Sequence, residues 1–70
     1  MDEFFRIWPI AKDRYGLERK VVSNFEEAYI RIYQDQQIIV RVDGTYDDTE
    51  LLYTTAANRL LDWMDQKEKT

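Results

Sequence analysis

The stretch from Ala28 to Val42, AYIRIYQDQQIIVRV, constrains the fold of this chain more than any other. It is the densest run of β-branched and aromatic residues in the sequence, and these residue types favour strands. Apolar and polar residues alternate on each side of Gln34-Asp35-Gln36, with the period of a half-buried strand. The stretch therefore predicts a β-hairpin with a turn at these three residues.

The turn length follows from the alternation, because a slip of one residue would exchange the two faces of the sheet. A three-residue turn keeps the apolar residues on one face in three opposed pairs: Ala28–Val42, Ile30–Val40 and Ile32–Ile38. The other face then carries Tyr29, Arg31, Tyr33, Gln37, Ile39 and Arg41. On that face Tyr29 lies across from Arg41, within range of a cation–π contact. A two-residue turn would set Ile30 against Arg41 and mix the faces.

A helix over about residues 24–35 is the alternative. Ser23 to Glu26 matches a capping box, and five residues have the spacing of one helix face: Phe25, Ala28, Tyr29, Ile32 and Tyr33. Ile30 would then lie on the polar side, and the run is rich in strand formers. This alternative gives the element order ββαβα.

The segment from Phe4 to Ile10 predicts a further strand, apolar on both faces. Pro9 lacks an N–H, which confines that strand to a sheet edge or a bulge. Asp13 and Gly16 supply turn chemistry before Leu17–Val22 returns as its partner strand.

The chain ends in a predicted helix from about Asp47 to Gln66. Asp47 and Glu50 have capping-box spacing, and the acids around them suit the positive end of the helix dipole. Its apolar stripe is Leu52, Ala56, Leu60 and Trp63, with Tyr53, Ala57, Leu61 and Met64 beside it. Asp62, Asp65 and Glu68 lie on the outer side.

These elements predict a single α+β domain over residues 1–70: a small antiparallel sheet of three to four strands with the C-terminal helix packed on one face. One helix cannot cover both faces of the sheet. Monomers seldom expose a large apolar patch, so we expect the other face to dock against another molecule.

Composition excludes several classes of function. The chain has no His and no Cys, and Ser23 is its only serine, so the usual nucleophile–base pairs cannot form. Asp43, Asp47, Asp48 and Glu50 do not have calcium-loop spacing. We therefore expect no catalysis, metal, cofactor or small-molecule substrate.

The N-terminus is acidic and no apolar run reaches the length of a membrane span, so we expect a cytoplasmic protein.

The formal net charge of −4 resides in residues 42–70, which hold seven acids and three bases. A negative field opposes nucleic acid unless the bases gather on one face. We therefore predict a protein-binding module, self-associating or docking a larger partner. The predicted binding residues are Trp8, Tyr29, Arg31, Tyr33, Ile39 and Arg41 on the sheet, with Asp47, Asp48, Glu50, Asp62 and Asp65 on the helix selecting a basic surface.

Two alternatives remain for the function. The acidic helix is typical of small viral or mobile-element inhibitors that mimic nucleic acid. The tyrosines and arginines of the hairpin are also typical of sheets on which single-stranded bases stack.

Overall fold

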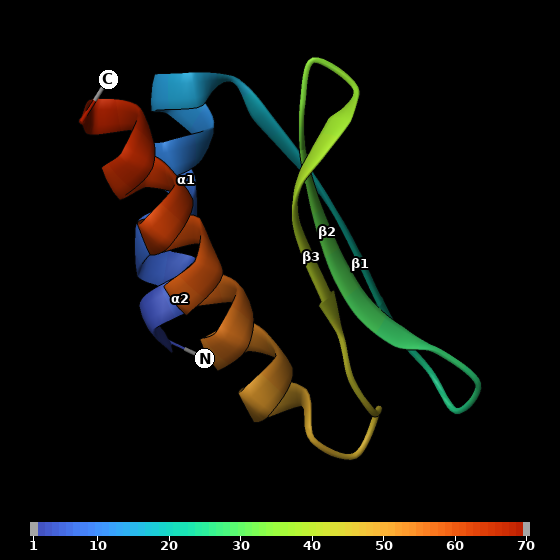
Figure 1. The fold of residues 1–70 in the computed structure, drawn as a ribbon. Coiled ribbons are helices and arrows are strands. Elements are labelled where there is room, and N and C mark those ends of the chain that lie inside the picture. The colour runs from blue at the N-terminus through green and yellow to red at the C-terminus, as the bar shows by residue number, and fades with distance from the viewer. Residues whose placement is uncertain (1, 70) are drawn as a thin grey trace.

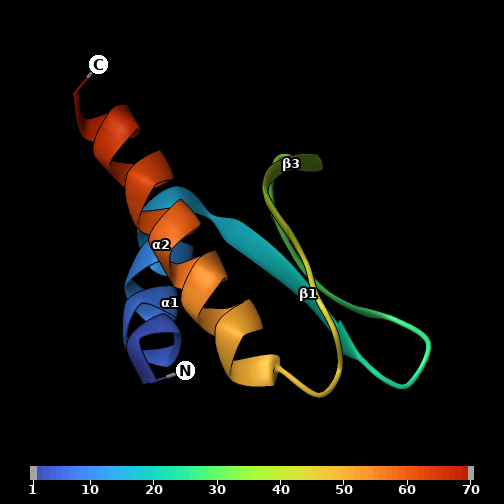
Figure 2. The same cartoon turned by 60° about the horizontal axis from the view of Figure 1, so that its bottom comes forward.

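The computed structural model describes residues 2–69. They form two helices and three strands: α1 (Asp2–Tyr15), β1 (Leu17–Ser23), β2 (Ala28–Gln34), β3 (Gln37–Asp43) and α2 (Thr49–Glu68). The strands form one antiparallel sheet in the order β1-β2-β3. Both helices lie on the same face of this sheet, and the other face is left open (Figures 1 and 2). The predicted α+β class, with an antiparallel sheet and a C-terminal helix on one face, is confirmed.

The predicted strand at Phe4–Ile10 is wrong, because this segment belongs to α1. Phe4, Ile7, Trp8 and Ala11 are its buried residues, and their spacing is that of one helix face. The aromatic and β-branched residues of this segment have strand propensity. Burying these four side chains between the sheet and α2 outweighs that propensity.

Pro9 lies inside α1, where its ring removes one backbone hydrogen bond to the Phe5 carbonyl. Both residues are exposed, so the freed carbonyl lies on the outer side of the helix. The helix ends at Gly16, which has a φ of 65° and donates its N–H to the Lys12 carbonyl at 2.9 Å. This is a left-handed C-terminal cap, a conformation in which glycine carries no side-chain penalty.

The predicted pairing of Leu17–Val22 with Phe4–Ile10 is also wrong, because β1 pairs with β2. Between them, the Asn24 side chain accepts hydrogen bonds from the N–H groups of Glu26 at 2.9 Å and Glu27 at 2.8 Å. The connection is thus a tight loop, and residues 24–35 do not form the alternative helix.

The hairpin of β2 and β3 is confirmed, but its turn is shorter than predicted. Asp35 and Gln36 alone form the turn, with φ values of 51° and 68°, as two-residue hairpin turns require. An irregularity in the ladder beside Ile39 then restores the alternation. The observed pairs are Ile32–Val40 and Ile30–Val42, shifted from the predicted register. The bulge thus keeps the apolar residues of both strands on one face, which is the role expected of the three-residue turn.

The N-terminal capping residue of α2 lies one position later than predicted. The carboxylate of Asp48, rather than Asp47, accepts the N–H of Leu51 at 3.2 Å. The buried residues of α2 are Leu52, Ala56, Ala57 and Leu60, while Trp63 and Met64 pack against the core from its edge. Facing them from the sheet are Leu17, Ala28, Ile30, Ile32, Val40 and Val42. No helix within residues 2–69 is long and apolar enough to cross a bilayer.

Candidate functional site

The face of the sheet opposite the helices is the candidate site, and we call its nine residues the open face. Ile30 and Ile32 point into the core, so their neighbours along β2 point to the opposite side. The pairing of β2 with both other strands arranges the open face in three rows: Val22–Tyr29–Asp43, Lys20–Arg31–Arg41 and Glu18–Tyr33–Ile38.

The middle row of the open face consists only of cations. Lys20, Arg31 and Arg41 cross the three strands in line, between the two tyrosines of β2. The rows above and below add two carboxylates, so the open face carries a net charge of +1 in a chain whose formal net charge is −4. The fold therefore separates positive charge onto the side of the sheet that neither α1 nor α2 covers.

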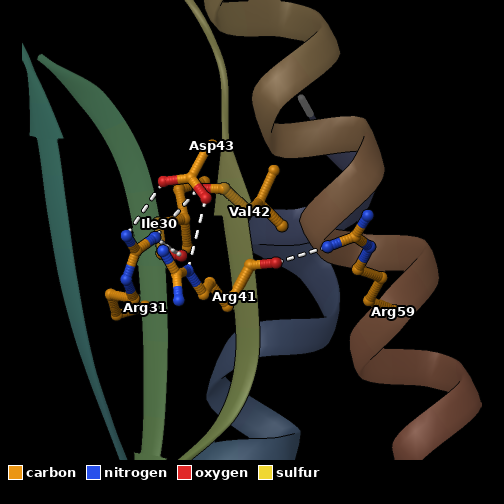
Figure 3. A network of polar contacts seen from close by, with 6 residues as sticks. All are labelled: Ile30, Arg31, Arg41, Val42, Asp43 and Arg59. Atoms are coloured by element: carbon orange, nitrogen blue, oxygen red, sulfur yellow. Dashed lines mark hydrogen bonds and ion pairs between the residues drawn. The ribbon is translucent and has the colours of Figure 1, made fainter.

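Arg31 is held in place at the centre of this face (Figure 3). Its Nη2 lies 2.9 Å from Oδ1 of Asp43, and its Nη1 donates to the carbonyls of Val42 at 3.2 Å and Ile30 at 3.3 Å. Its guanidinium also covers the ring of Tyr29, 4.4 Å from the centroid. Only 15% of the Arg31 side chain is exposed. The arginine is thus immobilised before any partner binds.

The predicted cation–π pair of Tyr29 with Arg41 is wrong. The shifted register sets Tyr29 opposite Asp43 and sets Arg41 opposite Arg31. Arg31 is two residues from Tyr29 on the same strand, so both side chains share the open face and can stack.

Asp43 joins the two arginines, because its Oδ2 lies 3.3 Å from Nε of Arg41. The hydrogen bond from Arg31 is the largest effect and lowers the pKa of Asp43. Desolvation opposes it, but the charges of Arg31 and Arg41 add to the lowering, so the pKa lies below its usual value. Asp43 is therefore ionised at neutral pH. Asp43 neutralises one of the two guanidinium charges, so the group of Arg31, Arg41 and Asp43 keeps a net charge of +1.

The open face brings together four of the predicted binding residues: Tyr29, Arg31, Tyr33 and Arg41. Trp8 is not among them, because it is 7% exposed and stacks on Phe4 with centroids 6.0 Å apart. Its predicted place on the uncovered sheet face is wrong, since α1 turns it into the core. Ile39 is half-buried and packs against the core at the bulge, so Ile38 takes its place on the open face.

The predicted acidic residues lie in two separate groups on α2. Asp47, Asp48 and Glu50 lie at its N-terminal end, and Asp62 and Asp65 begin about 18 Å further along its axis. The carboxylate of Asp48 caps the N-terminus of α2. Oδ2 of Asp65 lies 3.1 Å from Nζ of Lys69. These acids therefore do not form one continuous row. In the part of the chain that the structure describes, no cluster of acidic side chains is arranged to hold a metal ion.

Sequence reasoning missed five residues of the open face: Glu18, Lys20, Val22, Ile38 and Asp43. The sequence predicts that Leu17–Val22 pairs with a strand at Phe4–Ile10, and it does not indicate that Lys20 lies beside Arg31. The alternation within β1 could have placed Lys20 and Val22 on one face, but only the pairing with β2 sets them beside the tyrosines.

Comparison with known proteins found no matching family model, no matching curated protein and no matching solved structure.

Proposed function

We propose that this protein is a non-enzymatic binding module that docks a larger protein through its open face. The observation that carries the proposal is the arrangement of Tyr29 and Tyr33 around the immobilised Arg31 on a sheet face that neither α1 nor α2 covers. Tyrosine and arginine are enriched among the residues that dominate binding energy. A side chain already held in place also loses little entropy when a partner binds.

The charge of the open face defines the partner. Lys20, Arg31 and Arg41 favour a surface that places carboxylates over the middle row, with apolar groups over the tyrosines. Two copies meeting through this same face about a two-fold axis would bring their cations together. The proposed partner is therefore a different protein with an acidic surface. This assigns charge selectivity to the sheet rather than to the divided acids of α2.

The experiment compares three forms of the immobilised protein: wild type, Tyr29→Ala/Tyr33→Ala, and Thr54→Ala/Asn58→Ala as a control on the exposed side of α2. Each form is incubated with an extract of the source cells, and proteins retained by the wild type are identified. The affinity of a purified retained protein is then measured by calorimetry. Two tyrosine anchors at about 1.4 kcal/mol each predict a loss of about 100-fold for the tyrosine variant.

The control variant should bind the retained protein as tightly as the wild type does. Both tyrosines are half-buried on the open side, so their replacement should lower affinity much more than thermal stability. Equal affinity of all three forms for the retained protein would show that the open face is not the docking surface.

Single-stranded nucleic acid is the second candidate ligand, and the row Lys20–Arg31–Arg41 between two tyrosines favours it. Three phosphate contacts predict a slope of about −2 for the logarithm of the binding constant against the logarithm of salt concentration. Titration of labelled oligothymidylate at about 50 mM and about 200 mM salt measures that slope. No binding at the lower concentration would remove this candidate.

A further inference from the structure

The two edges of the sheet differ in how they are protected. At the β3 edge, the Arg59 side chain of α2 donates a hydrogen bond to the backbone carbonyl of Arg41 (Figure 3). The irregularity at Ile39 also distorts this edge, and α2 packs along the strand. Occupied carbonyls and bulges are devices that prevent a further strand from pairing. The β3 edge is therefore closed.

The β1 edge has no such protection. Within residues 2–69, the backbone groups of β1 that point away from β2 have no hydrogen-bond partner. A hollow lies on each side of this edge. Trp8, Lys12, Leu17, Glu18 and Arg19 line the hollow on the helix side, and Glu18, Arg19, Lys20, Tyr33 and Gln36 line the other. An added strand would thus find free backbone groups and space for side chains on both faces.

We propose that β1 pairs antiparallel with β1 of a second copy of this chain, about a two-fold axis at Arg19. The two three-stranded sheets then join into one sheet of six strands. Pairing about a two-fold axis closes on itself and gives a dimer rather than a fibre.

Charge complementarity selects the second copy and the register. Side chains stay on their own faces only when the axis passes through a residue position, because a slip of one residue exchanges the faces. With the axis at Arg19, Glu18 lies opposite Lys20 of the second copy, and this ion pair occurs twice. Moving the axis by one residue sets Glu18 against Glu18 or Lys20 against Lys20. Like charges directly opposite each other are destabilising.

The helix side of β1 fits the same register. Leu17 lies opposite Val21 of the second copy, so two apolar residues of the inner face meet twice. Arg19 lies on the axis, but its guanidinium is drawn over the rings of its own α1, 5.2 Å from Trp8 and 5.8 Å from Phe4. The two guanidinium groups are therefore directed toward separate aromatic clusters.

This inference goes beyond the proposed function, because it concerns the edge of the sheet and needs no foreign partner. In the dimer the two open faces become one continuous surface on the same side of the joined sheet. The paired strands have only seven residues each. The interface is then small, and we expect a dimer that dissociates in the micromolar range.

Sedimentation equilibrium of the purified chain tests the pairing through exchange of charges. Glu18→Lys and Lys20→Glu each replace two ion pairs by two repulsions, which should weaken dimerisation by about tenfold or more. The double variant Glu18→Lys/Lys20→Glu restores both ion pairs in reversed order and should dimerise like the wild type. Glu50→Lys on α2 makes the same change in net charge as Glu18→Lys and is the matched control for that variant. Glu18, Lys20 and Glu50 are exposed, so these variants should fold, which circular dichroism checks.

Three results would overturn the inference: a wild type that stays monomeric at millimolar concentration, single variants that dimerise as the wild type does, or a double variant that does not recover. Tyr29→Ala should leave dimerisation unchanged, because Tyr29 lies on the central strand. Loss of the dimer in that variant would move the interface to the open face and would also refute edge pairing. The measurement uses this chain alone, so failure to find a partner for the open face does not affect it.

Discussion

Replacing Phe4 by Ala should remove a large part of the stability of this protein. Phe4 is fully buried, and its ring lies 5.2 Å from the Tyr53 ring of α2 and 6.0 Å from the Trp8 ring of α1. Truncation of a buried Phe costs about 3–5 kcal/mol, since it loses the transfer free energy and leaves a cavity. A chain of this length has a free energy of unfolding of about 4–10 kcal/mol. The variant should therefore lose at least about a third of its stability, and all of it where the wild type lies at the lower end of this range.

Urea denaturation followed by tryptophan fluorescence measures this loss, because Trp8 lies beside the substituted ring. At a slope of about 1 kcal/mol per M, the midpoint should fall by about 3 M or more. Ile30→Val is a milder variant at another fully buried position, and it should lose about 0.5–1.5 kcal/mol. It provides a measurable transition even where the Phe4 variant is unfolded without urea.

Phe25→Ala is the matched control, because it deletes the same ring from a side chain that is 82% exposed. Its free energy of unfolding should change by no more than about 0.5 kcal/mol. Equal losses for the two Phe variants would refute the packing of α1 between the sheet and α2. A small loss at Phe4 with a normal urea slope would do the same.

Three further perturbations test the elements around this core. Asp48→Ala should destabilise the protein by about 1 kcal/mol in thermal denaturation by removing the cap of α2, whereas Asp47→Ala should have less than half that effect. The pKa of Asp43 is lowered in the folded state, so its ionisation adds stability above the unfolded-state pKa, and that stability disappears as pH falls through the folded pKa. Asp43→Asn should therefore flatten the decline in urea midpoint as the pH falls below about 4, and an unchanged decline would contradict the pairing with Arg31. Gln36→Gly should raise the urea midpoint by an amount equivalent to about 1 kcal/mol, because Gln36 has a φ of 68° that costs a side chain energy but not glycine; a lower midpoint would contradict this.

The hairpin and the C-terminal helix could be predicted because local and tertiary preferences agree there. The alternation from Ala28 to Val42 coincides with strand propensity, and the acids before Leu51 coincide with the start of an apolar stripe. The exact turn could not be predicted. The sequence has no Gly or Asn at Asp35-Gln36, and no residue type near Ile39 indicates a bulge.

The N-terminal segment was predicted wrongly because two patterns conflict within it. Phe4 to Ile10 has strand propensity, and Pro9 argues against a helix interior. The opposing signal is the spacing of Phe4, Ile7, Trp8 and Ala11, with acids in the first turn and Lys12 and Arg14 in the last. Helical periodicity over the whole segment therefore outweighed propensity over part of it.

The open face could be predicted only in part, because β2 carries Tyr29, Arg31 and Tyr33 whatever its neighbours are. The neighbouring strands β1 and β3 decide the net charge of the open face. Pairing with β1 brings Lys20 to Arg31, and the shifted register brings Arg41 to the same row. Composition alone shows an acidic chain, while pairing between distant segments makes one side of it basic.

The extra residue at Ile39 separates the hairpin into two parts that differ in burial. From Ala28 to Ile32 the ladder is tied to the helices through the core, whereas the tip from Tyr33 to Ile38 lies beyond the irregularity and contributes no fully buried side chain. A foreign loop grafted between Gln34 and Gln37 would thus be carried by the tip without altering the helix-facing layer. This small domain is therefore suited to displaying a variable loop at the hairpin tip while its helix-facing core stays constant.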